Sequence, residues 1–322
     1  MTISRRNFLG YCVASAAVLK LSSIDLFNLR AAFANPAGPK VLWIHGSGCS
    51  GCSISFLNRV PEDSDALYSI PGVSTVELLT GSSTLANSSV NLIYHATLMA
   101  AAGETASSAL LDVAATGNYV LIAEGGVATA FGGACSIPWS RDGQDVTFEK
   151  ALNDLASRAL SIVAFGTCAA YGGVSASGSN VPGVVSVSQA LPKKNVVNIS
   201  GCPPHPNWMV WAIAKLLGNG GTWPTSEGLD SYNRPLTLYG KEIHANCPRN
   251  NASTPHAAAF GVDNQCLIKL GCNGPGTYSP CPAIKWNDGS NWCIDANANC
   301  LGCVQPTFPN APGNPDFYTL PR

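Results

Sequence analysis

The sequence predicts an α/β fold, with a doubly wound parallel sheet over about residues 38 to 217 and a loop-rich second domain after it. Short apolar runs rich in Val, Ile and Leu alternate with segments of helical spacing in the first two thirds of the chain. Several of these runs are unbroken, as expected for strands that are buried on both faces. From about Thr222 onward the periodicity fades, and Pro, Gly and Asn become frequent.

The individual elements follow from the same patterns. The expected strands are the run that opens at Val41, then Val73–Leu79, Tyr119–Ala123, Leu160–Phe165 and Asn195–Ile199. The expected helices are Ile54–Val60, an Ala-rich and mostly helical stretch Val90–Ala115 that breaks near Gly103, Thr147–Ala159 and Asn207–Leu217.

The composition indicates a protein that works in a complex. Of the 322 residues, 46% are hydrophobic and only 11% are charged, whereas about 25% of residues are charged in a typical soluble protein. A large permanent interface with a partner accounts for such a surface. The net charge of -1 gives no electrostatic basis for binding nucleic acid or an anionic membrane.

The N-terminus has the features of an export signal. Ser4-Arg5-Arg6-Asn7-Phe8-Leu9 is a twin-arginine motif, and an apolar region follows it. Ala32-Phe33-Ala34 fits a cleavage site, so we expect residues 1–34 to be a twin-arginine signal peptide and the mature protein to be periplasmic. No later stretch approaches the roughly 18 apolar residues that span a bilayer, so we expect no membrane anchor on this chain.

Four cysteines follow the ends of expected strands. Cys49 and Cys52 follow the first strand, Cys168 follows the fourth and Cys202 follows the fifth. Parallel strands deliver their carboxyl ends to one edge of a sheet, where ligands bind. Four thiolates at one place indicate zinc or an iron–sulfur cluster.

The loop-rich segment from residue 222 to 322 needs cross-links, because it has too few apolar residues in regular elements to be ordered alone. It holds seven cysteines, and His244 stands three residues before Cys247. The odd number fits disulfides badly, whereas seven cysteines and one histidine supply eight ligands for two four-ligand clusters.

Two other functions remain open at this point. Gly46, Gly48 and Gly51 match the dinucleotide-binding pattern G-x-G-x-x-G, which would indicate a nucleotide-dependent dehydrogenase. The acidic residue that this pattern requires is poorly placed, because Glu77 comes late and lies inside an apolar run. A secreted binding protein with disulfides is the second alternative.

Several motifs together resemble the small subunit of a nickel–iron hydrogenase, over nearly the whole chain. They are C-S-G-C at 49–52, G-T-C-A at 166–169, G-C-P-P-H-P at 201–206, Y-G-K-E-I-H-A-N-C-P-R at 239–249, C-L-I-K-L-G-C-N-G-P at 266–275, C-P-A-I-K-W-N at 281–287 and C-L-G-C at 300–303. The resemblance implies a flavodoxin-like domain over residues 35–221 and a C-terminal domain over residues 222–322 that iron–sulfur clusters hold together.

The resemblance also implies three clusters in a line. A proximal 4Fe-4S cluster would be held by Cys49, Cys52, Cys168 and Cys202. A distal 4Fe-4S cluster would be held by His244, Cys247, Cys266 and Cys272. A medial cluster would be held by Cys281, Cys300 and Cys303, with the position before Ile294 as its variable fourth site.

The variable position of the medial cluster is Cys293 in this chain, where most relatives have proline. A fourth thiolate predicts a 4Fe-4S medial cluster, a feature that resembles the nickel–iron–selenium branch of the family. If Cys293 is not a ligand, the expected cluster is 3Fe-4S.

The resemblance places the H2 site on another chain. The nickel–iron or nickel–iron–selenium centre would belong to a large subunit, and a cytochrome-type carrier would accept the electrons. This chain would carry no catalytic residue and would conduct electrons between the two.

A few polar residues have weaker assignments. Glu124, at the same sheet edge as the first cysteines, is a candidate for a carboxylate that supports the proximal site or relays protons; a plain turn carboxylate is the alternative. Cys135 is expected to be a buried structural thiol. His45, His95 and His256 show no sign of a ligand role in the sequence.

Overall fold

The centre of the fold is a parallel sheet, of which the described residues form five strands. The computed structural model describes residues 39–58, 91–287 and 289–310. The strands are β1 (Lys40–His45), β2 (Leu92–His95), β3 (Tyr119–Glu124), β7 (Ser161–Phe165) and β9 (Val196–Ile199), in the order β2-β1-β3-β7-β9. Every neighbouring pair is parallel. The predicted parallel α/β architecture is therefore confirmed, and the order of the described strands is that of flavodoxin-like sheets.

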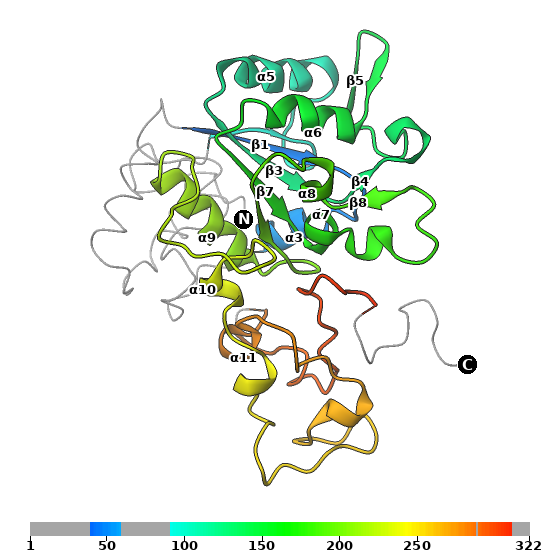
Figure 1. The fold of residues 1–322 in the computed structure, drawn as a ribbon, viewed down its shortest axis with the longest axis vertical. Coiled ribbons are helices and arrows are strands. Elements are labelled where there is room, and N and C mark those ends of the chain that lie inside the picture. Colours follow the sequence, from blue (N-terminus) through cyan, green and yellow to red (C-terminus); the bar gives the residue numbers. More distant parts are fainter. Residues whose placement is uncertain (1–38, 59–90, 288, 311–322) are drawn as a thin grey trace, which may run out of the picture.

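Each strand buries both of its faces, because successive side chains alternate between two apolar cores. Trp43, Ile122 and Phe165 face the core that contains α3 (Gly51–Leu57) and α9 (Pro206–Gly218). Their neighbours Leu42 and Leu121 face the other core, formed with α5 (Gly103–Thr116) and α6 (Phe148–Ala156). Figure 1 shows α5 and α6 together on one side of the sheet and α9 on the opposite side. The unbroken apolar runs in the sequence follow from this double coverage.

Short elements connect these layers. They are β4 (Val127–Ala128), η1 (Ala130–Gly133), β5 (Trp139–Arg141), β6 (Gln144–Val146), α7 (Thr167–Tyr171), η2 (Gly173–Ala176), β8 (Val184–Val185) and α8 (Val187–Ala190). β4 pairs with β8 and β5 pairs with β6, both antiparallel. Nowhere in the described ranges does a helix have both the length and the apolar character that crossing a bilayer requires.

The helical prediction for Val90–Ala115 is wrong over its first part. Residues 92–95 form strand β2, and the helix α5 begins at Gly103. The sequence Leu-Ile-Tyr-His is typical of a strand, but the alanines after it dominated the pattern. The predicted strand Val73–Leu79 and the signal peptide lie outside the described residues, and α3 begins at Gly51 rather than at Ile54.

Between residues 222 and 310 the described part of the chain has few regular elements, as predicted. They are α10 (Leu236–Tyr239), η3 (His244–Asn246), η4 (Leu267–Leu270) and α11 (Cys281–Ile284). In Figure 1 most of this segment, coloured yellow to red, lies below the sheet. Its last part returns to the sheet, because the Thr167 hydroxyl donates to the Cys303 carbonyl.

Arg234 joins this segment to the rest of the fold. Its side chain is 2% exposed. The guanidinium pairs with the Asp230 carboxylate at 2.8 Å and donates to the Val304 carbonyl at 3.0 Å. It also lies over the Tyr239 ring, 4.9 Å from the ring centroid. One buried cation therefore fixes the backbone beside Cys303 to the loop after α9.

We predict that Arg234→Met lowers the free energy of unfolding by about 3 kcal/mol, because it breaks a buried ion pair and leaves Asp230 and the Val304 carbonyl without their donor. The matched control is Arg141→Met, since the Arg141–Asp142 pair is mostly exposed and should contribute less than about 1 kcal/mol. Urea unfolding followed by tryptophan fluorescence measures both. Equal midpoints for the two variants would contradict the role given to Arg234.

Candidate metal centres

The carboxyl ends of three strands carry the first group of thiols, called here the sheet-edge set: Cys49, Cys52, Cys168 and Cys202. Cys49 and Cys52 lie in the turn from β1 into α3, Cys168 in the first turn of α7 after β7, and Cys202 after β9. The turns are tied together, because the Thr167 amide donates to the Gly201 carbonyl and the Gly201 amide donates to the Thr167 hydroxyl, both at 2.9 Å. The Ser55 hydroxyl of α3 donates to the Pro204 carbonyl at 2.7 Å, so the turn after β1 meets the turn after β9, and all three turns converge as expected.

Glycines make room for the thiols at this edge. Gly166 has φ +91, and a Cβ on it would lie 2.5 Å from the Cys52 Sγ. Gly173, also left-handed at φ +49, would place a Cβ 2.9 Å from the Cys168 amide nitrogen. Because only glycine combines this backbone conformation with the missing side chain, the thiols can approach one another here.

The charges of the sheet-edge thiols act on one another. Burial raises the pKa of Cys52 well above its usual value, and Glu124 and the other three thiols raise it further. Burial also raises the pKa of Cys202 to about 11, with added contributions from Cys168 and Cys49. Thiols that influence one another in this way are close enough to form one site. A bound metal would have to displace their protons.

A second group, called the cavity set, comprises Cys281, Cys293, Cys300 and Cys303. All four line one cavity of about 430 Å³. Burial raises the pKa of Cys300 to about 12, and the neighbouring Cys281 and Cys293 add to the shift. The structure therefore places Cys293, the variable position, with the other three thiols.

Hydrogen-bond donors surround the cavity set. The Ser279 hydroxyl donates to the Cys281 Sγ at 2.8 Å, and a hydrogen bond from Trp286 also reaches this sulfur. The indole nitrogen of Trp292, which lines the same cavity, is buried and has no partner among the described residues. Since buried donors are nearly always satisfied, this nitrogen fits a site whose acceptor is a sulfur-rich group.

The third group, called the histidine set, comprises His244, Cys247, Cys266 and Cys272. These four residues line one small pocket. Burial raises the pKa of Cys247, and both Cys272 and Cys266 raise it further. His244 begins η3, and its carbonyl accepts from the Cys247 amide at 3.1 Å. One imidazole and three thiols are thus brought together from separate loops.

The three groups follow one another in space. Cys202 of the sheet-edge set also lines the cavity of the cavity set, and a backbone hydrogen bond from Cys202 reaches the Cys303 thiol. At the other end, Cys272 of the histidine set raises the pKa of both Cys293 and Cys300. The cavity set therefore lies between the other two.

One expectation for a single residue needs correction, and one group of residues was not foreseen. Cys135 is exposed rather than buried, because it lies in a surface turn between η1 and β5. His45 and His95, which seemed uninformative, lie beside Glu124 as a compact group. Both histidines end parallel strands, so they could have been placed together by the reasoning used for the cysteines, that parallel strands bring their carboxyl ends to one edge of the sheet. His95 was missed because β2 was predicted to be helical.

Comparison with known proteins gives consistent results. A family model for the C-terminal part of the NiFe/NiFeSe hydrogenase small subunit matches residues 239–314. A second, "NADH ubiquinone oxidoreductase, 20 Kd subunit", matches residues 49–216. The periplasmic [NiFeSe] hydrogenase small subunit of Desulfomicrobium baculatum is 36% identical, over 99% of this chain and 99% of that protein. The chain belongs to the small-subunit family of NiFe and NiFeSe hydrogenases.

Other relatives agree with this assignment. The periplasmic [NiFe] hydrogenase small subunit 1 of Nitratidesulfovibrio vulgaris is 31% identical, over 95% of this chain and 90% of that protein. Among solved structures, the [NiFeSe] hydrogenase of Desulfovibrio vulgaris Hildenborough aligns with a TM-score of 0.74 and 34% identity, over 87% of this chain and 97% of that one. As a hydrogenase small subunit, the chain is one part of a heterodimer, and iron–sulfur clusters are the cofactors of this family.

We predict that Gly166→Ala lowers the iron content of the purified protein, because the new Cβ pushes the Cys52 thiol out of the sheet-edge set. The matched control is Gly143→Ala, since Gly143 has a similar φ of +71 but open space around its Cβ position. Gly166 also has a ψ of 155, a backbone conformation that is essentially restricted to glycine, so the two variants are compared by their iron content, which only Gly166→Ala should lose in elemental analysis. Unchanged iron in Gly166→Ala would contradict the assignment of Cys52 as a ligand.

Proposed function

We propose that this chain is the electron-transfer subunit of its hydrogenase and conducts electrons between the H2 site of the large subunit and an external carrier through three iron–sulfur clusters. One observation carries the proposal: three groups of four metal-ligand side chains lie in series, and the middle group shares a hydrogen bond with the first and interacts electrostatically with the third. A series of redox groups buried in protein is what a conductor needs. A purely structural metal site would need only one group.

Each ligand set is assigned to one cluster. The sheet-edge set holds the proximal 4Fe-4S cluster, the cavity set holds the medial one and the histidine set holds the distal one. These clusters supply one-electron oxidation and reduction, with potentials set by net charge, hydrogen bonds and exposure. The neutral imidazole of His244 removes one negative charge from the distal site and so raises its potential relative to an all-thiolate site.

In this proposal the sheet edge lies against the large subunit. Cys49 and Cys202 are exposed in the chain described here. On the adjoining helix α3, the side chain of Ile54 is 55% exposed and that of Leu57 is 42% exposed. An apolar face next to exposed ligand thiols suits a permanent interface. The interface would bring the proximal cluster near the metals of the large subunit.

The export signal, the domain boundaries and the electron acceptor complete the proposal. The twin-arginine motif, together with relatives named as periplasmic, supports export of the chain after residues 1–34 direct it to the membrane. The domains are residues 35–221, with the proximal cluster, and residues 222–322, with the other two. A cytochrome-type carrier would accept electrons at the histidine-set end.

The alternatives have weaker support. The glycine pattern at 46–51 does lie between a strand and a helix, but its turn carries two thiols, for which nucleotide binding has no use. A disulfide-bonded secreted protein would pair its cysteines, whereas every cysteine of the described ranges is free.

The proposal is tested on the heterodimer purified without oxygen. We expect about twelve iron atoms on this chain, four in each of three 4Fe-4S clusters. We also expect broad visible absorption that bleaches on reduction with H2. Substitution of His244 by Ala should slow electron delivery to an external dye while H2/D2 exchange at the partner continues. A colourless complex, or one that contains zinc in place of iron, would exclude an electron-conducting role for this chain.

We predict that Cys293→Pro converts the medial cluster from 4Fe-4S to 3Fe-4S, because three thiolates leave one iron without its protein ligand. Electron paramagnetic resonance of the oxidised heterodimer should show a new, near-isotropic 3Fe-4S signal in this variant and none in the wild type. Cys135→Ser is the matched control, since Cys135 belongs to none of the three sets. A strong 3Fe-4S signal in freshly prepared wild-type protein would contradict the role of Cys293.

A further inference from the structure

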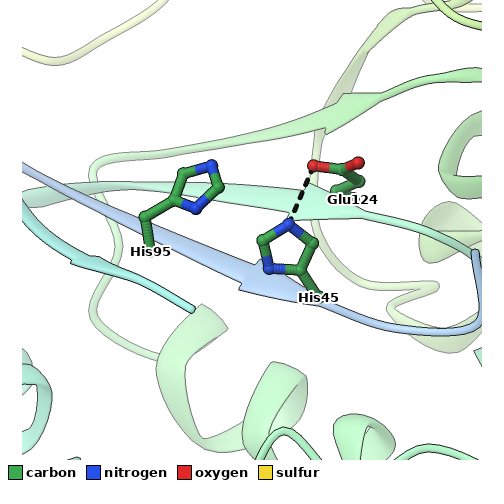
Figure 2. A group of neighbouring side chains, drawn as sticks. All are labelled: His45, His95 and Glu124. Atoms are coloured by element: carbon green, nitrogen blue, oxygen red, sulfur yellow. Dashed lines mark ion pairs between the residues drawn. The ribbon is translucent and has the colours of Figure 1, made fainter. Parts of the chain in front are cut away.

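Beside the sheet-edge set lies a buried polar group that none of the three clusters uses. Figure 2 shows His45, His95 and Glu124 turned toward one another, from the last residues of β1, β2 and β3. The His45 Nε2 lies 3.0 Å from the Glu124 Oε2, and one ligand-type atom of each residue lies within 4.8 Å of the others. Glu124 is 3% exposed. A carboxylate in such a place needs compensation from its surroundings.

Four contacts supply that compensation. The Trp43 Nε1 donates to the Glu124 Oε2 at 2.9 Å. The Ser53 hydroxyl donates to the same oxygen at 2.6 Å, and the Ser53 amide donates to Oε1 at 3.2 Å. The His45 imidazole is the fourth partner. Burial alone would raise the pKa of Glu124, but the contacts with His45 and Ser53 hold it below its usual value, so the carboxylate stays ionised.

This charge lies close to a candidate cluster ligand. Ser53 is the residue after Cys52. The Cys52 Sγ lies 3.8 Å from the Phe165 carbonyl oxygen. The ring of Phe165 packs against Trp43, which also donates to Glu124. The Ser53 amide, which follows Cys52 directly in the chain, donates to the Glu124 Oε1 at 3.2 Å. The carboxylate is therefore held against the turn that carries the Cys52 thiol.

We propose that Glu124 is a positioning residue for the proximal cluster: it holds the Ser53 amide and, through its buried negative charge, lowers the reduction potential of the cluster. The inference rests on the proposed function, since it needs a cluster on the sheet-edge set. Reduction adds one negative charge to the cluster, so a fixed carboxylate nearby disfavours the reduced form. An amide that donates to Glu124 is also unavailable to a cluster sulfur, and a missing N–H···S bond lowers the potential in the same direction.

A metal ion is the competing explanation for the same three side chains. Two imidazoles and one carboxylate can bind a divalent transition metal. Burial, with His45 adding to it, lowers the pKa of His95 to about 3, so its imidazole is neutral and able to act as a ligand. The carboxylate oxygens, however, already accept from Trp43 and Ser53. The structure thus favours a hydrogen-bonded network over a metal site, and metal analysis separates the two.

The test is a redox titration of the intact heterodimer, followed by electron paramagnetic resonance. The proximal signal is identified as the one that Gly166→Ala removes. Glu124→Gln should shift the potential of this signal upward and leave the medial and distal potentials unchanged. Glu124→Asp keeps the charge and should shift the potential less. Glu104→Gln removes an equal charge from an exposed position on α5 and should leave all three potentials unchanged.

Ser53→Ala separates the charge from the packing of the turn, because it removes one donor and keeps the carboxylate. A fully loaded Glu124→Gln variant with an unchanged proximal potential would overturn the inference. So would an equal upward shift in Ser53→Ala, or one equivalent of zinc or another non-cluster metal that is bound in the wild type and lost in Glu124→Gln. Failure of the proposed function would look different, since the wild-type complex would then show no proximal signal at all.

Discussion

The register of the parallel sheet is the constraint on which the candidate chemistry depends. Hydrogen bonding between neighbouring strands pairs His45 with Glu124, Glu124 with Phe165 and Phe165 with Ile199. These residues end their strands in one row, so the turns that follow begin at the same level. Four cysteines far apart in the sequence are therefore delivered to one place by backbone geometry alone, and a one-residue slip in any strand would move its turn out of the site.

The same row explains why a polar network lies beside the thiols. Residues paired across a parallel sheet point to the same face, so His45 and Glu124 lie on the face of Trp43 and Phe165. Toward β7 and β9 this face is apolar and supports the sheet-edge set. Toward β1 and β2 it is polar, because the serine after Cys52 and both histidines surround one carboxylate. The buried carboxylate of Glu124 and the sheet-edge set thus lie on the same face of the sheet.

Much of this arrangement could be predicted from the sequence, but only where the signal was local. Unbroken apolar runs identified β3, β7 and β9, and the cysteines after β7 and β9 indicated a shared site. The strand Leu92–His95 was missed because four residues beside an alanine-rich stretch give too short a pattern. The contacts of Glu124 were out of reach for the same reason, since they require knowing that β1, β2 and β3 end together. Cys135 was expected to be a buried structural thiol because no ligand role could be assigned to it, although its turn is exposed.

The desolvation of the thiols links metal binding to the order of the C-terminal part. Burial is the main reason why the pKa values of Cys281, Cys300 and Cys303 are raised, so without a metal these side chains remain protonated. Protonated thiols offer only weak contacts, and the segment around them has few regular elements to replace those contacts. A metal-bound group that stabilises the thiolates would supply the missing free energy, because ligand binding to a site formed only in the folded state is folding free energy. On this argument the cavity set is assembled and filled in one event. The twin-arginine signal predicted from the sequence, which directs folded proteins to export, is consistent with this order of events.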